Sequence, residues 1–152
     1  MKTRLNFAQA SPGAYKAMAA LQAHVERCGL ESSLLELVKF RASQINGCAY
    51  CLDMHSKNAR AAGETEQRLY TLPAWRETPF YSERERAALA WTEALTLIAD
   101  THAPDDVYAA ARTQFSEAEL VDLTAAIVAI NGWNRLAIGF RSEPGSYQPA
   151  GH

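Results

Sequence analysis

Hydrophobic residues recur at three- and four-residue steps along nearly the whole chain, and this spacing is typical of amphipathic helices. Residues 14–30 and 32–45 both carry the pattern, and each segment ends at a glycine or an Asn-Gly pair. A third helix is expected to begin at or near Cys48 and to run to Gly63. A fourth, shorter helix is expected over residues 66–72.

The second half of the chain contains two sequence signals for helix starts. Ser82 with Glu85, and Ser116 with Glu119, have the spacing of a capping box, and an apolar periodic segment follows each pair. A short helix is expected between them, over residues 104–111. The helix that starts after Ser116 has little polar face for nearly three turns, which suits burial on several sides. Other helices of the chain or an oligomer would both provide that burial.

These patterns predict an all-α fold. No credible pair of alternating strands occurs, and no linker or internal repeat divides the chain. We expect a single-domain helical bundle of about six to seven helices over residues 1–152, with a core of about 15–141. The tail, residues 142–152, contains two prolines and two glycines and is expected to be extended.

Composition and charge narrow the class of protein. The chain has 152 residues, 48% of them hydrophobic and 21% charged, with a formal net charge of -2. This balance gives no general attraction to nucleic acid or to anionic membranes. No apolar run approaches the roughly 20 residues that span a bilayer, and the first residues do not resemble a secretory signal. A cytoplasmic location is the expectation.

The segment "INGCAYCLDMH", residues 45–55, is the main candidate for chemistry. If Cys48 opens a helix, the helix dipole and free backbone N–H groups favour its thiolate. Cys51 lies three residues on, within disulfide reach, and His55 lies four residues further on nearly the same face. A thiolate, a second thiol and an imidazole can together reduce a peroxide through a sulfenic acid and a disulfide. The spacing alone does not decide which sulfur attacks.

Two other groups bear on this chemistry. Glu36 lies among apolar residues of the preceding segment, so it is either at the edge of the core or buried with a raised pKa, where it could orient His55. Asp53 points to another helix face and is interpreted as solvated. A structural zinc site is the main rival, because Cys28 with the motif residues would form a Cys₃His set. Against zinc, Cys28 fits better as a small core residue.

The segment "ELVKFRASQINGCAYCLDMHSKNARAAGE" resembles the AhpD-like alkylhydroperoxidase branch of the carboxymuconolactone decarboxylase family. Two later segments, "LPAWRETPFYSERERAALAWTEALTLI" and "INGWNRLAIGFR", are similar to the continuation of its small members. The resemblance covers about residues 15–141. Its most specific part is Glu36 twelve positions before Cys48, followed by CxxC and His55.

The resemblance implies an all-helical protein that assembles into homo-oligomers, commonly trimers or hexamers. It also implies a cofactor-free, thiol-dependent peroxidase acting on organic hydroperoxides, with Cys51 as the peroxidatic cysteine and Cys48 as the resolving one. Glu36 and His55 would form the proton relay, and a thioredoxin-like protein or a lipoyl group would supply the reducing dithiol. The position of His55 four residues after Cys51 gives this assignment a physical reason.

Two departures from the family pattern matter. AhpD itself is longer and has a histidine between its cysteines, where this chain has Tyr50. The decarboxylase branch acts on a muconolactone without a cysteine pair, so Cys48 and Cys51 argue against that reaction. The alternatives to a peroxidase are a dithiol–disulfide oxidoreductase or redox sensor with little peroxide turnover, and a zinc-stabilised, non-enzymatic protein.

Overall fold

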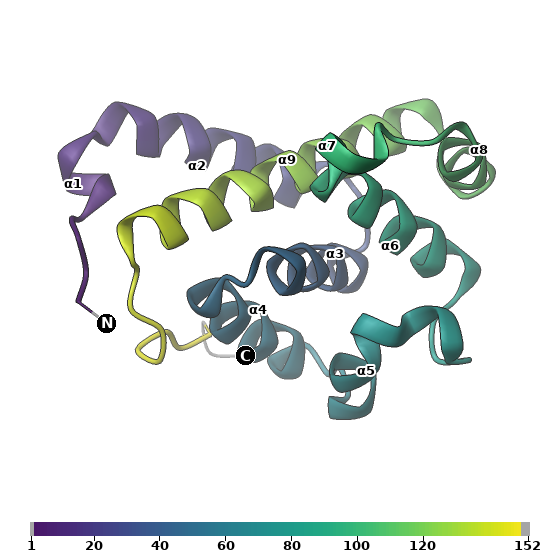
Figure 1. Ribbon diagram of the computed structural model, residues 1–152, viewed down its shortest axis with the longest axis horizontal. Coiled ribbons are helices and arrows are strands. Elements are labelled where there is room, and N and C mark those ends of the chain that lie inside the picture. The colour runs from purple at the N-terminus through teal and green to yellow at the C-terminus, as the bar shows by residue number, and fades with distance from the viewer. Residues whose placement is uncertain (1, 150–152) are drawn as a thin grey trace.

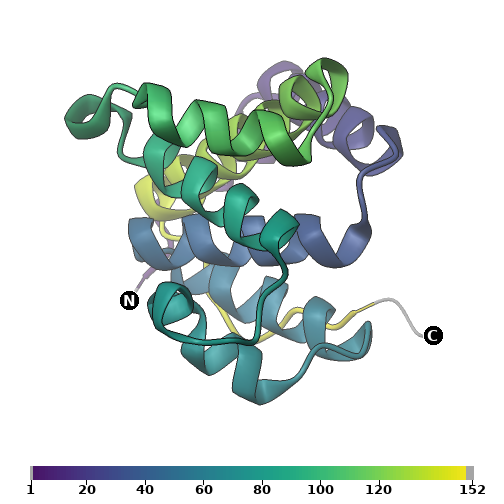
Figure 2. The ribbon, with the colours of Figure 1, turned by 90° about the vertical axis from the view of Figure 1, so that its right-hand side faces the viewer.

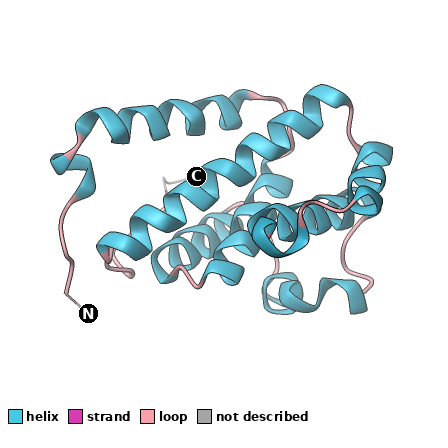
Figure 3. Ribbon diagram, turned by 45° about the horizontal axis from the view of Figure 1, so that its top comes forward, coloured by secondary structure: helices cyan, strands magenta, loops and turns pink. Residues whose placement is uncertain are grey.

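The computed structural model describes residues 2–149, and over that range the secondary structure is helical without a strand (Figures 1 and 3). This confirms the predicted fold class. The elements in chain order are α1 (Phe7–Ala10), α2 (Pro12–Arg27), α3 (Ser32–Asn46), α4 (Ala49–Ala61), α5 (Glu66–Thr71), a 3₁₀ helix η1 (Leu72–Glu77), α6 (Glu83–Thr96), α7 (Ile98–Thr101), α8 (Asp105–Gln114) and α9 (Glu117–Phe140).

The described part of the chain has more helices than the six or seven expected. The additional elements α1, η1 and α7 are four to six residues long. Elements this short span at most two turns, so they leave no clear hydrophobic period in the sequence. The long helices begin and end close to the predicted residues, because their boundaries depend on local backbone chemistry.

The predicted helix caps are present. Ser82 and Ser116 each accept a hydrogen bond from the backbone of the glutamate three residues on, and that glutamate accepts one from the serine N–H in return. Gly47 ends α3 with φ 68°, a left-handed conformation that glycine adopts readily. The chain then reverses, with the N–H of Cys48 donating to the Ser43 carbonyl at 3.0 Å.

Helix α3 is the central element of the fold. It packs against α4, α6 and α9, and Figure 2 shows it between the α2–α9 layer and the α4–α5 layer. Its apolar residues are therefore shared between two clusters: Leu34, Leu35 and Val38 pack with α6 and α9, and Leu37 and Phe40 pack towards α5 and η1. This burial on both sides fixes the position of α3, and α3 contributes side chains to the candidate site.

The unusual asparagine of the apolar helix α9 has an internal role. Asn134 is 0% exposed, and its amide donates to Ser43 Oγ at 3.1 Å. Its oxygen accepts from Asn46 Nδ2 at 2.8 Å. The neighbouring Arg135 is exposed and donates to Asn131 of its own helix. This network joins α9 to the end of α3, immediately before the Cys48 turn.

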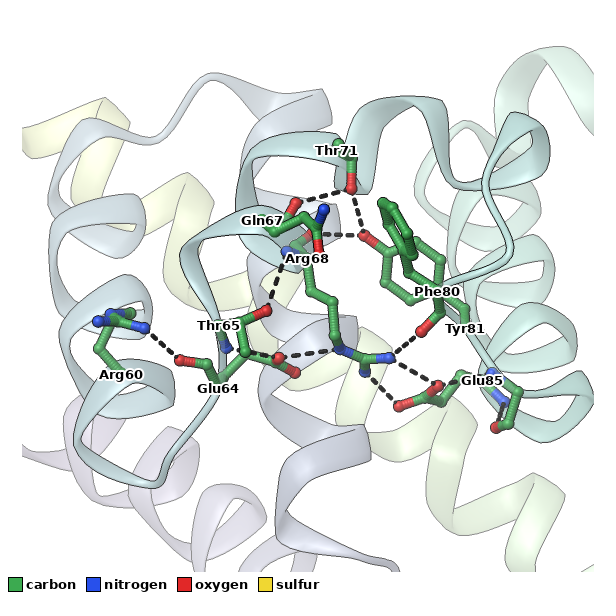
Figure 4. A network of polar contacts seen from close by, with 10 residues as sticks. Arg60, Glu64, Thr65, Gln67, Arg68, Thr71, Phe80, Tyr81 and Glu85 are labelled. Atoms are coloured by element: carbon green, nitrogen blue, oxygen red, sulfur yellow. Dashed lines mark hydrogen bonds and ion pairs between the residues drawn. The ribbon is translucent and has the colours of Figure 1, made fainter.

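Helix α5 is connected to α6 by a second polar network (Figure 4). The guanidinium of Arg68 donates to Glu64 at 2.9 Å, to Glu85 at 2.6 Å and to the Phe80 carbonyl. The Tyr81 hydroxyl donates to the Arg68 carbonyl. These contacts hold the segment after α4 against the start of α6.

The two ends of the described chain pack against different helices, the C-terminal segment against α4 and the N-terminal segment against the end of α9. In Figure 1 the segment after α9 turns back along α4, where Lys57 Nζ donates to the Tyr147 carbonyl at 3.0 Å. The N-terminal segment contacts the end of α9, with the N–H of Arg4 donating to the Phe140 carbonyl at 3.0 Å. Residues 142–149 are free of helix, as expected for the tail, and residues 150–152 lie outside the described residues. No helix in residues 2–149 combines the length and apolarity needed to cross a bilayer.

Candidate active site

The two motif cysteines lie together at the start of α4. Their sulfur atoms are 2.33 Å apart and form a disulfide, with 5.3 Å between the Cα atoms. Cys48 is the N-cap residue, and its Sγ accepts from the N–H of Cys51 at 3.3 Å. Each cysteine is 1% exposed. The pair is therefore a buried dithiol–disulfide couple at the positive end of a helix dipole, as its spacing predicted.

Helix α4 also carries His55, one turn after Cys51. His55 Nδ1 lies 2.9 Å from Oε2 of Glu36, which comes from α3. Because Nδ1 is held by the carboxylate, Nε2 is the ring nitrogen left to exchange a proton with a cysteine or a substrate. The crossing of α3 and α4 thus brings Glu36 and His55 together across 19 positions of sequence.

The carboxylate of Glu36 has a second partner, Lys39. Lys39 Nζ donates to Glu36 Oε1 at 3.1 Å, and Lys39 is 7% exposed. Burial alone would raise the pKa of Glu36. Hydrogen bonds and charge from His55 and Lys39 outweigh that effect and hold the pKa below its ordinary 4.5. The raised pKa expected for a buried Glu36 is therefore wrong, because the contacts with His55, and in addition the ion pair with Lys39 three residues away on the same helix, outweigh the effect of burial.

A cavity of about 570 Å³ gives access to these groups. Cys51, His55, Glu36 and Lys39 all line it, whereas Cys48 is not among its lining residues in the described part of the chain. Cys48 instead packs with Cys51 and Ala137 of α9 in a small apolar cluster. Of the two motif cysteines, Cys51 is therefore the one that lies beside the cavity in the described structure.

Several cavity residues could not be assigned from sequence. Trp133, interpreted as a core anchor, lines the cavity, and its ring centroid is 5.8 Å from that of Tyr15. Residues from both ends of the chain line it as well, including Leu5 and Tyr147. Asp53, interpreted as solvated, is not among the lining residues of the described structure; it is half-buried and accepts from the N–H of Gly145 at 3.0 Å. No local sequence pattern marks these residues, because they meet through contacts between distant segments.

The zinc set is not assembled in the described residues. The Sγ of Cys28 donates to the Val25 carbonyl at 3.0 Å, and Cys28 packs against the large core cluster of α3, α6 and α9. Cys48 and Cys51 belong to a separate cluster. Within residues 2–149 no group of three or more histidine, cysteine or acidic side chains has the geometry to hold a metal ion. The donor geometry therefore does not support the structural zinc alternative.

Comparisons with known proteins agree with the fold and with the motif. The family model described as "Carboxymuconolactone decarboxylase family" matches residues 12–94, which include both cysteines, His55 and Glu36. The uncharacterised protein YdfG of Bacillus subtilis is 40% identical over 146 residues, covering 96% of this chain and 99% of YdfG. The uncharacterised protein YnjA of Escherichia coli is 28% identical over 117 residues, covering 77% of this chain and 62% of YnjA.

Solved structures extend the likeness to three dimensions. A crystal structure from Agrobacterium tumefaciens, of a protein of unknown function proposed to be an antioxidant defence protein AhpD, is 51% identical. Its TM-score is 0.92 over 96% of this chain and 100% of that one. The debrominase Bmp8 shares the fold alone, at 21% identity and a TM-score of 0.80 over 91% of this chain and 74% of that one. The chain is thus an AhpD-like member of the carboxymuconolactone decarboxylase family.

Proposed function

We propose that the protein is a thiol-dependent peroxidase that reduces organic hydroperoxides at Cys51. The observation that carries the proposal is the position of Cys51 on the cavity that also contains the His55–Glu36 pair, with Cys48 in disulfide contact beside it. This arrangement provides a nucleophile beside a cavity, a proton carrier and a resolving thiol.

The reaction has two chemical steps in the reduced protein. The Cys51 thiolate attacks the terminal oxygen of the hydroperoxide, the O–O bond breaks, and the alkoxide takes a proton to leave as an alcohol. Cys51 is then a sulfenic acid. The Cys48 thiol condenses with it, which forms the disulfide and releases water.

His55 and Glu36 are proposed to move the proton for the first step. His55 Nε2 accepts the Cys51 proton, so that thiolate forms, and returns it to the leaving alkoxide. Glu36 holds Nδ1 of His55 and stabilises the imidazolium that forms in between. Lys39 adds to the effect of His55 in lowering the pKa of Glu36, so that the ionised carboxylate acts as an acceptor for His55.

An external dithiol is needed to complete the cycle. Thiol–disulfide exchange with a reduced dithiol returns Cys48 and Cys51 to thiols and leaves the reductant as a disulfide. The proposed donors are a thioredoxin-like protein or a lipoyl group. A slender lipoyl chain is favoured by the burial of both sulfurs, because a thiol on a broad protein surface reaches a buried disulfide with difficulty. We still expect the protein to be cytoplasmic and to assemble into a homotrimer or homohexamer.

The proposal is tested by steady-state turnover. We expect cumene hydroperoxide to be consumed continuously with reduced lipoamide as the electron donor, and lipoamide oxidation to match peroxide loss one to one. Rapid exchange with lipoamide but no peroxide-dependent turnover would contradict the peroxidase. It would indicate the dithiol–disulfide oxidoreductase or redox sensor instead.

A further inference from the structure

We propose that the cavity binds an uncharged, aromatic hydroperoxide, and that Tyr147 of the C-terminal segment is one of the residues that select it. The proposal rests on the proposed peroxidase function and specifies its substrate class. It follows from the side chains around the cavity, from the contacts that hold Tyr147 in place and from the distribution of charge.

Aromatic rings from distant parts of the chain line the cavity. They come from α1, α2, α4, α9 and the tail, and they are Phe7, Tyr15, Tyr50, Trp133 and Tyr147. Several of them are in contact: the ring centroids of Phe7 and Tyr15 are 6.4 Å apart, and those of Tyr15 and Trp133 are 5.8 Å apart. Rings at these separations contact one another directly in tilted or edge-on arrangements, so together they form an apolar, aromatic surface against which a ligand ring can pack.

The size of the cavity agrees with such a ligand. Its volume of about 570 Å³ lies within the roughly 300–1,000 Å³ of sites that enclose drug-sized molecules. A hydrogen peroxide or a tert-butyl hydroperoxide molecule would leave most of this space to water and would contact few of the rings. A hydroperoxide with one or two aromatic rings would fill it and still place its peroxide group at Cys51.

Tyr147 is held at the cavity by the tail. Its hydroxyl donates to Asn58 Oδ1 at 2.7 Å, and its carbonyl accepts from Lys57 Nζ at 3.0 Å. The N–H of Gly145 donates to Asp53 Oδ2 at 3.0 Å. Three residues of α4 thus fix the segment, and the Asn58 contact uses the polar end of Tyr147. Its hydroxyl and carbonyl are thus held by α4, and its ring is available to contact a ligand. Tyr147 therefore forms a fixed wall of the cavity.

The charged residues around the cavity disfavour an anionic ligand. Lys39 is paired with Glu36. Glu26 and Glu143 also line the cavity, and their described contacts are with the neutral side chains of Gln22 and Thr3. A carboxylate on the substrate would therefore enter a site with more acidic than basic groups. Fatty-acid hydroperoxides are expected to bind less well than uncharged aromatic ones.

The test uses binding of the redox-inert alcohol products to the full chain, so that it does not depend on turnover. We expect 2-phenylpropan-2-ol to bind at least about tenfold more tightly than tert-butanol, measured by calorimetry and by tryptophan fluorescence. Tyr147→Ala should weaken the affinity for the aromatic alcohol about two- to tenfold, the usual range for one lost aromatic contact. Tyr147→Leu, which keeps an apolar wall, provides a second variant if the alanine protein folds poorly.

Tyr70→Ala is the matched control, because Tyr70 is a surface tyrosine of α5 with 74% exposure. It should leave binding unchanged. Equal affinity for the two alcohols would overturn the proposal, as would equal weakening by Tyr147→Ala and Tyr70→Ala. A carboxylated analogue of the aromatic alcohol that binds as tightly as the neutral one would overturn the charge argument.

Failure of this inference and failure of the peroxidase function give different results. Selective binding of the aromatic alcohol without any hydroperoxide consumption would support the proposed ligand class and contradict the proposed peroxidase function. Turnover with the same kcat/KM for cumene and tert-butyl hydroperoxides, without selective binding, would support the peroxidase function and contradict the proposed ligand class.

Discussion

Replacing Cys51 by serine is expected to abolish hydroperoxide consumption, with a loss of about 10³-fold or more. The reason is that Cys51 lines the cavity and lies one turn before His55, whereas Cys48 is not among the lining residues of the described structure. A serine hydroxyl is not ionised at neutral pH and cannot be oxidised to a sulfenic acid. The measurement is peroxide loss against time with reduced protein.

Cys48→Ser separates the two cysteine roles. We expect one turnover per chain, ending in a sulfenic acid at Cys51 that a dimedone-type reagent traps. Cys28→Ser is the matched control, because Cys28 lies at the end of α2 in another cluster, and it should keep full activity. Oxidised sulfur in the Cys51→Ser protein and none in the Cys48→Ser protein would mean that the roles are reversed.

Glu36→Gln is expected to lower kcat/KM about 10- to 100-fold with little change in the fold. The amide can still contact His55, but it carries no charge to stabilise the imidazolium that forms during proton transfer. Protonation of Glu36 should have the same effect in the unchanged protein. Because its pKa lies below 4.5, the contribution of Glu36 is fully present above that pH and is lost as the pH falls below it.

The control for Glu36→Gln is Glu93→Gln. Glu93 is also a largely buried carboxylate with a lowered pKa: burial raises that pKa, but Arg76, Trp75 and Arg41 outweigh the effect. It does not line the cavity in the described structure. Glu93→Gln should reduce stability and leave kcat/KM near that of the unchanged protein. If Glu36→Gln also proves silent in kcat/KM, Glu36 has a structural role and the proposed relay is wrong.

The long helices and the motif could be predicted from sequence for physical reasons. Helix α4 begins at Cys48 because Gly47 adopts a left-handed conformation and Cys48 caps the next helix, and both signals are local. Capping boxes likewise mark α6 and α9. The spacing of Cys48, Cys51 and His55 along one helix places them on one face without any tertiary contact.

The rest of the site depends on contacts that no local pattern reports. Glu36 reaches His55 because α3 crosses α4. Its apolar neighbours made Glu36 a candidate partner of His55, and the resemblance supported that pairing. The aromatic cavity is assembled from segments as distant as Tyr15 and Tyr147. Lys39 is different, since its position three residues after Glu36 is a local signal that could have indicated the ion pair, which adds to the lowering of the Glu36 pKa by His55.

The most direct test of the central claim is a thiol count and intact mass of reduced protein, before and after one equivalent of cumene hydroperoxide. We predict prompt loss of two thiols and a mass lower by two hydrogens, with the disulfide mapped to the peptide that contains Cys48 and Cys51. Cys28 should stay reduced. Unchanged thiols after the same treatment would contradict the account, because the motif would then be present without its chemistry.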